Sequence, residues 1–179
     1  DKTKYYKDAM VRLESDGDNL DHKTEKDSVK TKYKTKKGRT VYGGGGITPD
    51  YIIESGKISD YSYELRRNNV YYQFVRSYLD NNGNSIRDKY QNNLKMFLQD
   101  FQFTDEQLQG FIRYAETLKV KYNAKGFTAD KELIRANLKA FVARDIFKNK
   151  GWYATLLNSD LQFKKAVSLF GEAEKLSGN

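Results

Sequence analysis

The spacing of the apolar residues changes near Gly56, and this change constrains the fold more than any other feature of the sequence. Upstream, residues 29–35 alternate between lysines and β-branched or aromatic residues, which is the two-residue period of a strand. Lys37–Gly38 follows as a tight turn and residues 39–42 as a second strand-like run, a pattern that predicts a β-hairpin. Downstream, apolar residues recur at intervals of three and four, the period of amphipathic helices. We therefore predict a mainly α protein in which a short β-hairpin precedes the helices.

About five amphipathic helices are predicted in residues 57–179. Their apolar faces are, in chain order, Tyr71, Phe74, Val75 and Tyr78; Tyr90, Leu94, Phe97, Leu98 and Phe101; Leu108, Phe111, Ile112, Ala115 and Leu118; Ile134, Leu138, Phe141, Val142 and Ile146; and Phe163, Ala166, Val167, Phe170 and Ala173. Each such face must be buried against a neighbour. Helices of this kind form an antiparallel helical bundle, and the only proline, Pro49, lies upstream of all of them.

The ends of these helices are predicted from local signals. Asn82–Gly83 is expected to end the first helix, because both residues tolerate the left-handed conformation. Thr104–Gln107 has the pattern of a capping box, as does Ser159–Gln162. Thr128 is expected to cap the fourth helix, and Gly151 to interrupt it.

The composition argues against several kinds of site. The chain has no cysteine, which excludes a disulfide framework and a thiolate zinc site. His22 is the only histidine, which argues against a Ser-His-Asp triad and against a two-histidine metal site. We therefore expect no metal and no cofactor in this chain.

The net charge of +8 favours anionic partners such as nucleic acid or a membrane surface. Lys and Arg alternate with Asp and Glu along most of the chain, which is more typical of a solvated surface than of a nucleic-acid patch. No apolar run approaches the roughly 20 residues that span a bilayer, and no signal peptide follows Asp1. We expect no membrane span.

Four consecutive glycines, Gly43–Gly46, require a reason, because each costs about 0.5–1 kcal/mol relative to Ala in regular structure. A phosphate-binding loop is disfavoured: no Gly-Lys-Ser/Thr follows, and Pro49 leads an extended run instead of a helix. The residues themselves favour a tightly packed or flexible connection.

The stretch around these glycines resembles the end of the protease domain in carboxyl-terminal processing serine peptidases, also called tail-specific proteases. In that family the sequence G-R-x-V-Y-G-G-G-G-I-x-P-D closes the catalytic domain. The matching positions here are Gly38, Arg39, Val41, Tyr42, Gly43, Gly44, Gly45, Gly46, Ile47, Pro49 and Asp50, with Thr35 upstream. The resemblance is close over about residues 29–53.

The resemblance implies that the chain lies downstream of the chemistry. The family uses a serine nucleophile with a lysine base, and these residues and a PDZ-like module precede the glycine motif. No serine-centred motif of the family precedes Asp50 here, and Ser15 and Ser28 are interpreted as loop serines. The resemblance therefore implies no catalytic residue in this chain. Residues 1–56 are then the C-terminal end of the protease domain, with a charged arm at 1–28, and residues 57–179 a helical C-terminal domain.

Three functions remain open at this point. The first is a non-catalytic C-terminal portion of such a peptidase, in the periplasm or cell envelope of a bacterium. Its partners would be the upstream protease and PDZ-like domains, the tails of protein substrates, and a second copy in a homo-oligomer. The second is a basic helical module that binds nucleic acid. This function is disfavoured because the aromatic residues share helical faces with Leu and Ile, so core packing explains them better. The third is a helical scaffold that binds a protein partner.

Overall fold

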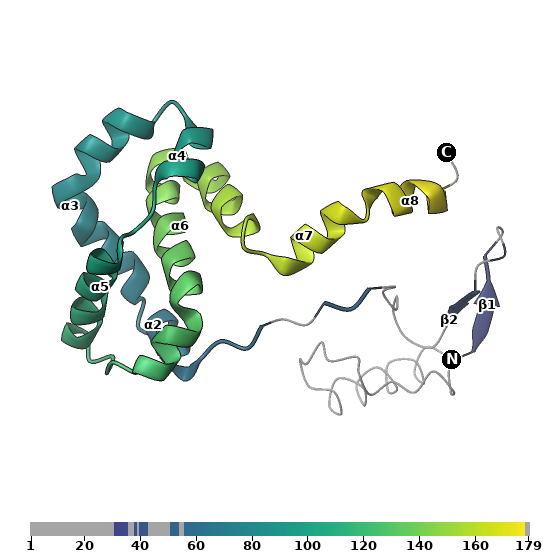
Figure 1. Ribbon diagram of the computed structural model, residues 1–179, viewed down its shortest axis with the longest axis horizontal. Helices are drawn as coiled ribbons and strands as arrows, with labels where there is room; N and C mark the ends of the chain where they lie inside the picture. Colours follow the sequence, from purple (N-terminus) through teal and green to yellow (C-terminus); the bar gives the residue numbers. More distant parts are fainter. Residues whose placement is uncertain (1–30, 36–37, 39, 43–50, 54–55, 178–179) are drawn as a thin grey trace, which may run out of the picture. The chain divides into compact units, whose positions relative to one another are not determined.

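The computed structural model of the protein describes residues 31–35, 38, 40–42, 51–53 and 56–177. Within these residues the chain forms two strands and then seven helices (Figure 1). The predicted mainly helical fold, with a short hairpin ahead of the helices, is therefore confirmed. The chain divides into two units, Asp1–Glu54 and Ser55–Asn179, and each is described by itself.

The first unit contains the β-hairpin. Strands β1 (Lys32–Lys34) and β2 (Thr40–Tyr42) pair antiparallel, with Tyr33 opposite Val41. The Gly38 N–H donates to the Thr35 carbonyl at 2.9 Å, which closes the turn. Gly38 has a φ of +80°, a left-handed conformation that glycine adopts without steric cost. The turn therefore explains the glycine at this position, whereas the assignment of the hairpin to a protease domain stays a prediction.

The second unit contains the helices. They are α2 (Asp60–Arg67), α3 (Val70–Tyr90), α4 (Leu94–Asp100), α5 (Asp105–Thr117), α6 (Ala124–Leu157), α7 (Leu161–Ser168) and α8 (Phe170–Ser177). The sequence analysis assigned no helix to α2, although Ser59 caps it by accepting a hydrogen bond from the Ser62 N–H at 3.2 Å. Helix α2 is short, and its buried apolar side chains, Tyr61 and Leu65, are too few to give a periodic signal.

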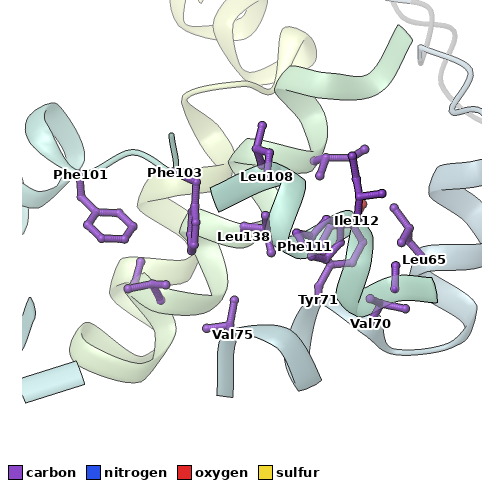
Figure 2. Close-up of a cluster of buried hydrophobic side chains, with 14 of the residues drawn as sticks. Leu65, Val70, Tyr71, Val75, Phe101, Phe103, Leu108, Phe111, Ile112 and Leu138 are labelled. Atoms are coloured by element: carbon purple, nitrogen blue, oxygen red, sulfur yellow. The ribbon is translucent and has the colours of Figure 1, made fainter. Parts of the chain in front are cut away.

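The core lies between α3 and α6, with α2 and α4 packed against both helices and α5 packed against α3. Figure 2 shows Tyr71 of α3, Phe111 of α5 and Leu138 of α6 together in this cluster. The Tyr71 and Phe111 rings stack at 5.4 Å between centroids. Phe111 and Leu138 are fully buried, and burial of one such side chain stabilises the fold by about 1.5–3 kcal/mol. The apolar faces predicted for the helices from residue 71 to residue 146 therefore form one core.

The end predicted for the first helix is wrong, because α3 continues through Asn82–Gly83 to Tyr90. The Asn82 side chain donates to the Tyr78 carbonyl at 2.9 Å, so it stays within the helix. Ile86 and Tyr90 are both buried and extend the apolar face by two more turns. This packing outweighs the roughly 1 kcal/mol that glycine costs in a helix. Tyr90 therefore ends α3 instead of opening the following helix.

The capping predictions had mixed outcomes. The capping box at Thr104 is confirmed: its hydroxyl accepts from the Gln107 N–H, and the Gln107 side chain accepts from the Thr104 N–H at 2.8 Å. Thr128 is wrong as a cap, because it lies inside α6 and is exposed. Asn123 caps α6 by accepting from the Gly126 N–H at 2.9 Å, a role for which Asn is as suited as Thr.

The cap of α7 lies one residue later than predicted. The Asp160 carboxylate accepts from the Phe163 N–H at 2.9 Å, whereas the Ser159 hydroxyl donates to the Leu156 carbonyl at 2.9 Å. An ionised carboxylate is a stronger acceptor for a helix N-terminus than a hydroxyl. Asp160 therefore takes the position that the pattern had assigned to Ser159.

The interruption of α6 lies at Lys148 and not at Gly151. Lys148 has φ 58° and ψ −146°, so the helical path breaks there and resumes after it. Gly151 is buried in the resumed part, where a Cβ would lie 2.4 Å from the Ala143 carbonyl oxygen. Glycine is required at this position by the close approach of two backbones.

The last predicted apolar face is not buried within the described residues. It is divided between α7 and α8, which Leu169 separates. The exposed fractions of Phe163, Val167 and Phe170 are 42%, 46% and 70%. The expectation that every apolar face packs against a neighbour is therefore wrong for this one.

Candidate functional site

Only some residues of the glycine motif are among the residues that the structure describes. Gly38, Val41 and Tyr42 lie in the hairpin turn and in β2. The remaining motif positions, Arg39, Gly43–Gly46, Ile47, Pro49 and Asp50, lie outside the described residues, as do Ser15, Ser28 and His22. The assignment of this motif to a protease domain stays a prediction.

Two properties of the described residues set limits on the kind of site. Among these residues, no cluster of three or more His, Asp or Glu side chains is arranged to hold a metal ion. None of the described helices is long and apolar enough to cross a bilayer. The helical unit does contain a cleft between two of its helices.

The cleft lies between α3 and α6 and has a volume of about 690 Å³. Side chains spaced three and four residues apart on the two helices form its walls. From α3 these are Tyr72, Val75, Arg76, Leu79, Asp80 and Arg87, and from α6 Phe141, Arg144, Asp145, Lys148 and Asn149. We call this feature the α3–α6 cleft. Four cations against two carboxylates give its walls a net charge of +2.

The cations of the cleft are not equally paired. Arg87 forms an ion pair with Asp145 at 3.0 Å and a hydrogen bond with Asn84 at 3.3 Å. Within the described residues no carboxylate pairs with Arg76 or Arg144, and both are exposed. The nearest polar contact of Arg76 is the Tyr72 hydroxyl at 3.4 Å. Most of the guanidinium donors on these two arginines therefore remain open to an anion.

Lys148 lines the cleft and has a backbone conformation that residues other than glycine rarely adopt. Its φ and ψ of 58° and −146° belong to a region populated almost only by glycine, and such conformations cost about 1–3 kcal/mol. Its ammonium group donates to the Asp145 carbonyl at 2.8 Å. The break at Lys148 thus places a further cation beside the two unpaired arginines.

Aromatic side chains contact two residues of the α6 wall, Phe141 and Arg144. The Phe141 ring meets Trp152 edge to face at 4.9 Å and is nearly parallel to Tyr71 at 6.3 Å. The Arg144 guanidinium lies 5.5 Å from the centre of the Trp152 ring, within the range of a cation–π contact. These contacts hold Arg144 at the cleft while its donors stay free.

A second, smaller hollow of about 200 Å³ contains a lysine and two hydroxyl groups. Burial lowers the pKa of Lys139, although Asp100 opposes this effect. Its ammonium group donates to the Leu98 carbonyl at 2.7 Å, near the end of α4. The Thr155 and Ser159 hydroxyls donate to backbone carbonyls of α6. Each group thus has a structural role, and we assign no serine–lysine pair here.

Asp130 ties the start of α2 to α6. Its carboxylate accepts from the Ser59 N–H at 2.8 Å and from the Ser59 hydroxyl at 2.6 Å. Burial acts to raise the pKa of Asp130, but hydrogen bonds from Ser59 and Ser62, together with the positive charge of Arg66, hold it below its usual value. Nearby, the Tyr61 hydroxyl is buried without a hydrogen-bond partner among the described residues. Burial raises the pKa of Tyr61 to about 12, with smaller effects from Tyr122 and Glu116.

Part of the helical unit matches one known protein family. Residues 61–148 match a family of unknown function, DUF8443. The matched segment contains every residue of the α3–α6 cleft except Asn149. No curated protein and no solved structure matches the chain.

The sequence analysis did not single out the cleft. Arg76 and Arg144 are 68 positions apart, and neither belongs to a motif. The available signal was the spacing of Arg144 and Lys148, which puts two cations on one face of a helix. That spacing predicts a charged helix face, but it does not identify the helix that packs opposite this face.

Proposed function

We propose that this chain is the C-terminal, non-catalytic portion of a carboxyl-terminal processing serine peptidase. The glycine motif that begins at Gly38 carries the proposal, since eleven of its positions match the sequence that closes the protease domain of that family. The hairpin supports it in one respect. Gly38 has a left-handed conformation in the turn, which gives a physical reason for the glycine at this position of the motif. The chain would then work in a bacterial periplasm or cell envelope.

In this proposal the helical unit packs on the protease domain, positions its substrate or mediates self-association, and it does not perform chemistry. The exposed apolar face of α7 and α8 supports a packing role, because large apolar side chains such as Phe170 are costly to leave in water. We propose that the upstream protease and PDZ-like domains of the parent protein cover this face. A second copy of the chain is the other occupant that an experiment must distinguish.

The reading frame upstream of Asp1 tests the assignment. We expect it to encode a PDZ-like module and a protease domain with a serine nucleophile and a lysine base. An upstream stop codon, or an unrelated domain in that position, would overturn the proposal.

The packing role has its own test in Phe170→Ser, with Lys164→Ser as the matched control on the same segment. We expect Phe170→Ser to destabilise the full-length parent by about 1.5–3 kcal/mol, but to leave the unfolding of the isolated chain almost unchanged. If the isolated chain instead forms a dimer that Phe170→Ser dissociates, the face is a contact between copies.

A further inference from the structure

We propose that the α3–α6 cleft is a binding site for an acidic peptide segment of a partner protein. The segment would place an Asp or Glu carboxylate on Arg76 and Arg144 and a neighbouring apolar side chain against Leu79 and Phe141. This site goes beyond the proposed peptidase assignment and does not depend on it, since it is argued from the cleft alone.

The charges of the cleft select an anion. Arg76 and Arg144 have no carboxylate partner among the described residues, and a guanidinium binds a carboxylate through two parallel N–H···O bonds. Arg87 is already held by Asp145, and so contributes less. Lys148 adds an ammonium group that donates a hydrogen bond to a neutral backbone carbonyl, that of Asp145. The cleft therefore offers more donors for an anion than its own carboxylates satisfy.

The size and the apolar residues of the cleft select a ligand with a hydrophobic part. A volume of about 690 Å³ gives this open cleft room for a few side chains of a ligand. Leu79 and Phe141, which are only partly buried, contribute apolar lining beside the cations, whereas Val75 belongs to the core. A bare inorganic anion would leave this part of the cleft unused, whereas a peptide with adjacent acidic and large apolar residues would occupy both parts.

Two features disfavour a nucleic acid as the occupant. Asp80 and Asp145 lie in the walls and would repel a phosphate backbone that follows the cleft. The Phe141 ring already packs against Tyr71 and Trp152, which restricts the stacking of a base on it. Tyr72, which is 45% exposed, is then the aromatic side chain of the cleft walls that a base could reach.

Fluorescence anisotropy with the whole chain tests the site. The probe is a short fluorescein-labelled peptide, blocked at both ends, in which Asp and Glu flank one Phe; its Asn/Gln counterpart is the control peptide. We expect the acidic peptide to bind and the control peptide to bind at least about tenfold more weakly, as the loss of a charge-assisted contact implies. The affinity should fall as salt is raised.

Variants locate the binding in the cleft. Arg76→Gln and Arg144→Gln should each weaken binding about three- to tenfold, whereas Arg113→Gln, an exposed arginine on α5 outside the cleft, should not. Asp145→Asn should strengthen binding, because it removes a negative charge and releases Arg87. Circular dichroism of each variant confirms that it is folded, and the gain in Asp145→Asn cannot result from unfolding.

Three results would overturn the proposal. One is the absence of acidic-peptide binding at low salt, and another is equal weakening by Arg113→Gln and by the two cleft variants. The third is tighter binding of a single-stranded oligonucleotide, or equal competition by inorganic phosphate, through the same arginines. None of these results bears on whether a protease domain lies upstream.

Discussion

Gly151→Ala provides a sharp test of the packing at the break in α6. An added Cβ would lie 2.4 Å from the Ala143 carbonyl oxygen and 2.7 Å from the Phe147 Cβ. Neither neighbour is the end of a flexible side chain, so the backbone must move. In an open helix the same change stabilises by up to about 1 kcal/mol, but overpacking of this kind costs about 1–3 kcal/mol. We therefore expect a net destabilisation of about 1–2 kcal/mol.

Gly110→Ala is the matched control, because the nearest atom to its added Cβ is the flexible end of Arg113 at 3.9 Å. This change should stabilise the fold by about 0.5–1 kcal/mol. Urea unfolding followed by far-UV circular dichroism measures both variants against the unchanged chain. If Gly151→Ala is as stable as Gly110→Ala, the close approach of the two parts of α6 is wrong.

Three further changes test other features of the helical unit. Lys148→Gly should stabilise the fold by about 1 kcal/mol in urea unfolding, because glycine relieves the strained conformation; a loss of stability would show that Lys148 is not strained. The lowered pKa of Asp130 means that its contribution is present above the unfolded value near pH 4 and is lost as pH falls through the folded value. Asp130→Asn should therefore destabilise at neutral pH and flatten the acid side of the stability profile, whereas an unchanged profile would contradict the role of Ser59. Thr104→Ala should cost about 1 kcal/mol as a lost cap, and Thr128→Ala should stay within about 0.5 kcal/mol in the same assay; equal losses would contradict the placement of the two residues.

The parts of the fold that depend on local chemistry could be predicted from the sequence. The capping box at Thr104 needs only Gln107, three residues away, so the pattern and the geometry coincide. The hairpin turn likewise needs only a residue that accepts a positive φ, and Gly38 supplies it. Apolar periodicity located the core faces of α3, α5 and α6 because each repeats over several turns.

The parts that depend on distant contacts could not be predicted. Asn82–Gly83 looks like a helix end, and only the burial of Ile86 and Tyr90 carries α3 past it. The break at Lys148 has no signal of its own, because lysine is an ordinary helix residue. It depends on how the resumed helix packs, which the nearby Gly151 accommodates.

The candidate cleft is a tertiary feature for the same reason. Its two unpaired arginines, Arg76 and Arg144, come from different helices and are 68 positions apart in the sequence. Sequence reasoning found the glycine motif instead, which lies mostly outside the described residues. The two findings are independent, since one concerns the origin of the chain and the other a surface of its helical unit.

Cleavage of a protein with a labelled C-terminal tail tests the proposed function most directly. The assay compares the product of the full reading frame with the 179-residue chain alone. We predict that the full product removes the tail and that substitution of its upstream serine abolishes this activity, while the chain alone leaves the substrate intact. Robust cleavage by the chain alone, or an inactive full product without a serine–lysine protease domain, would contradict the account.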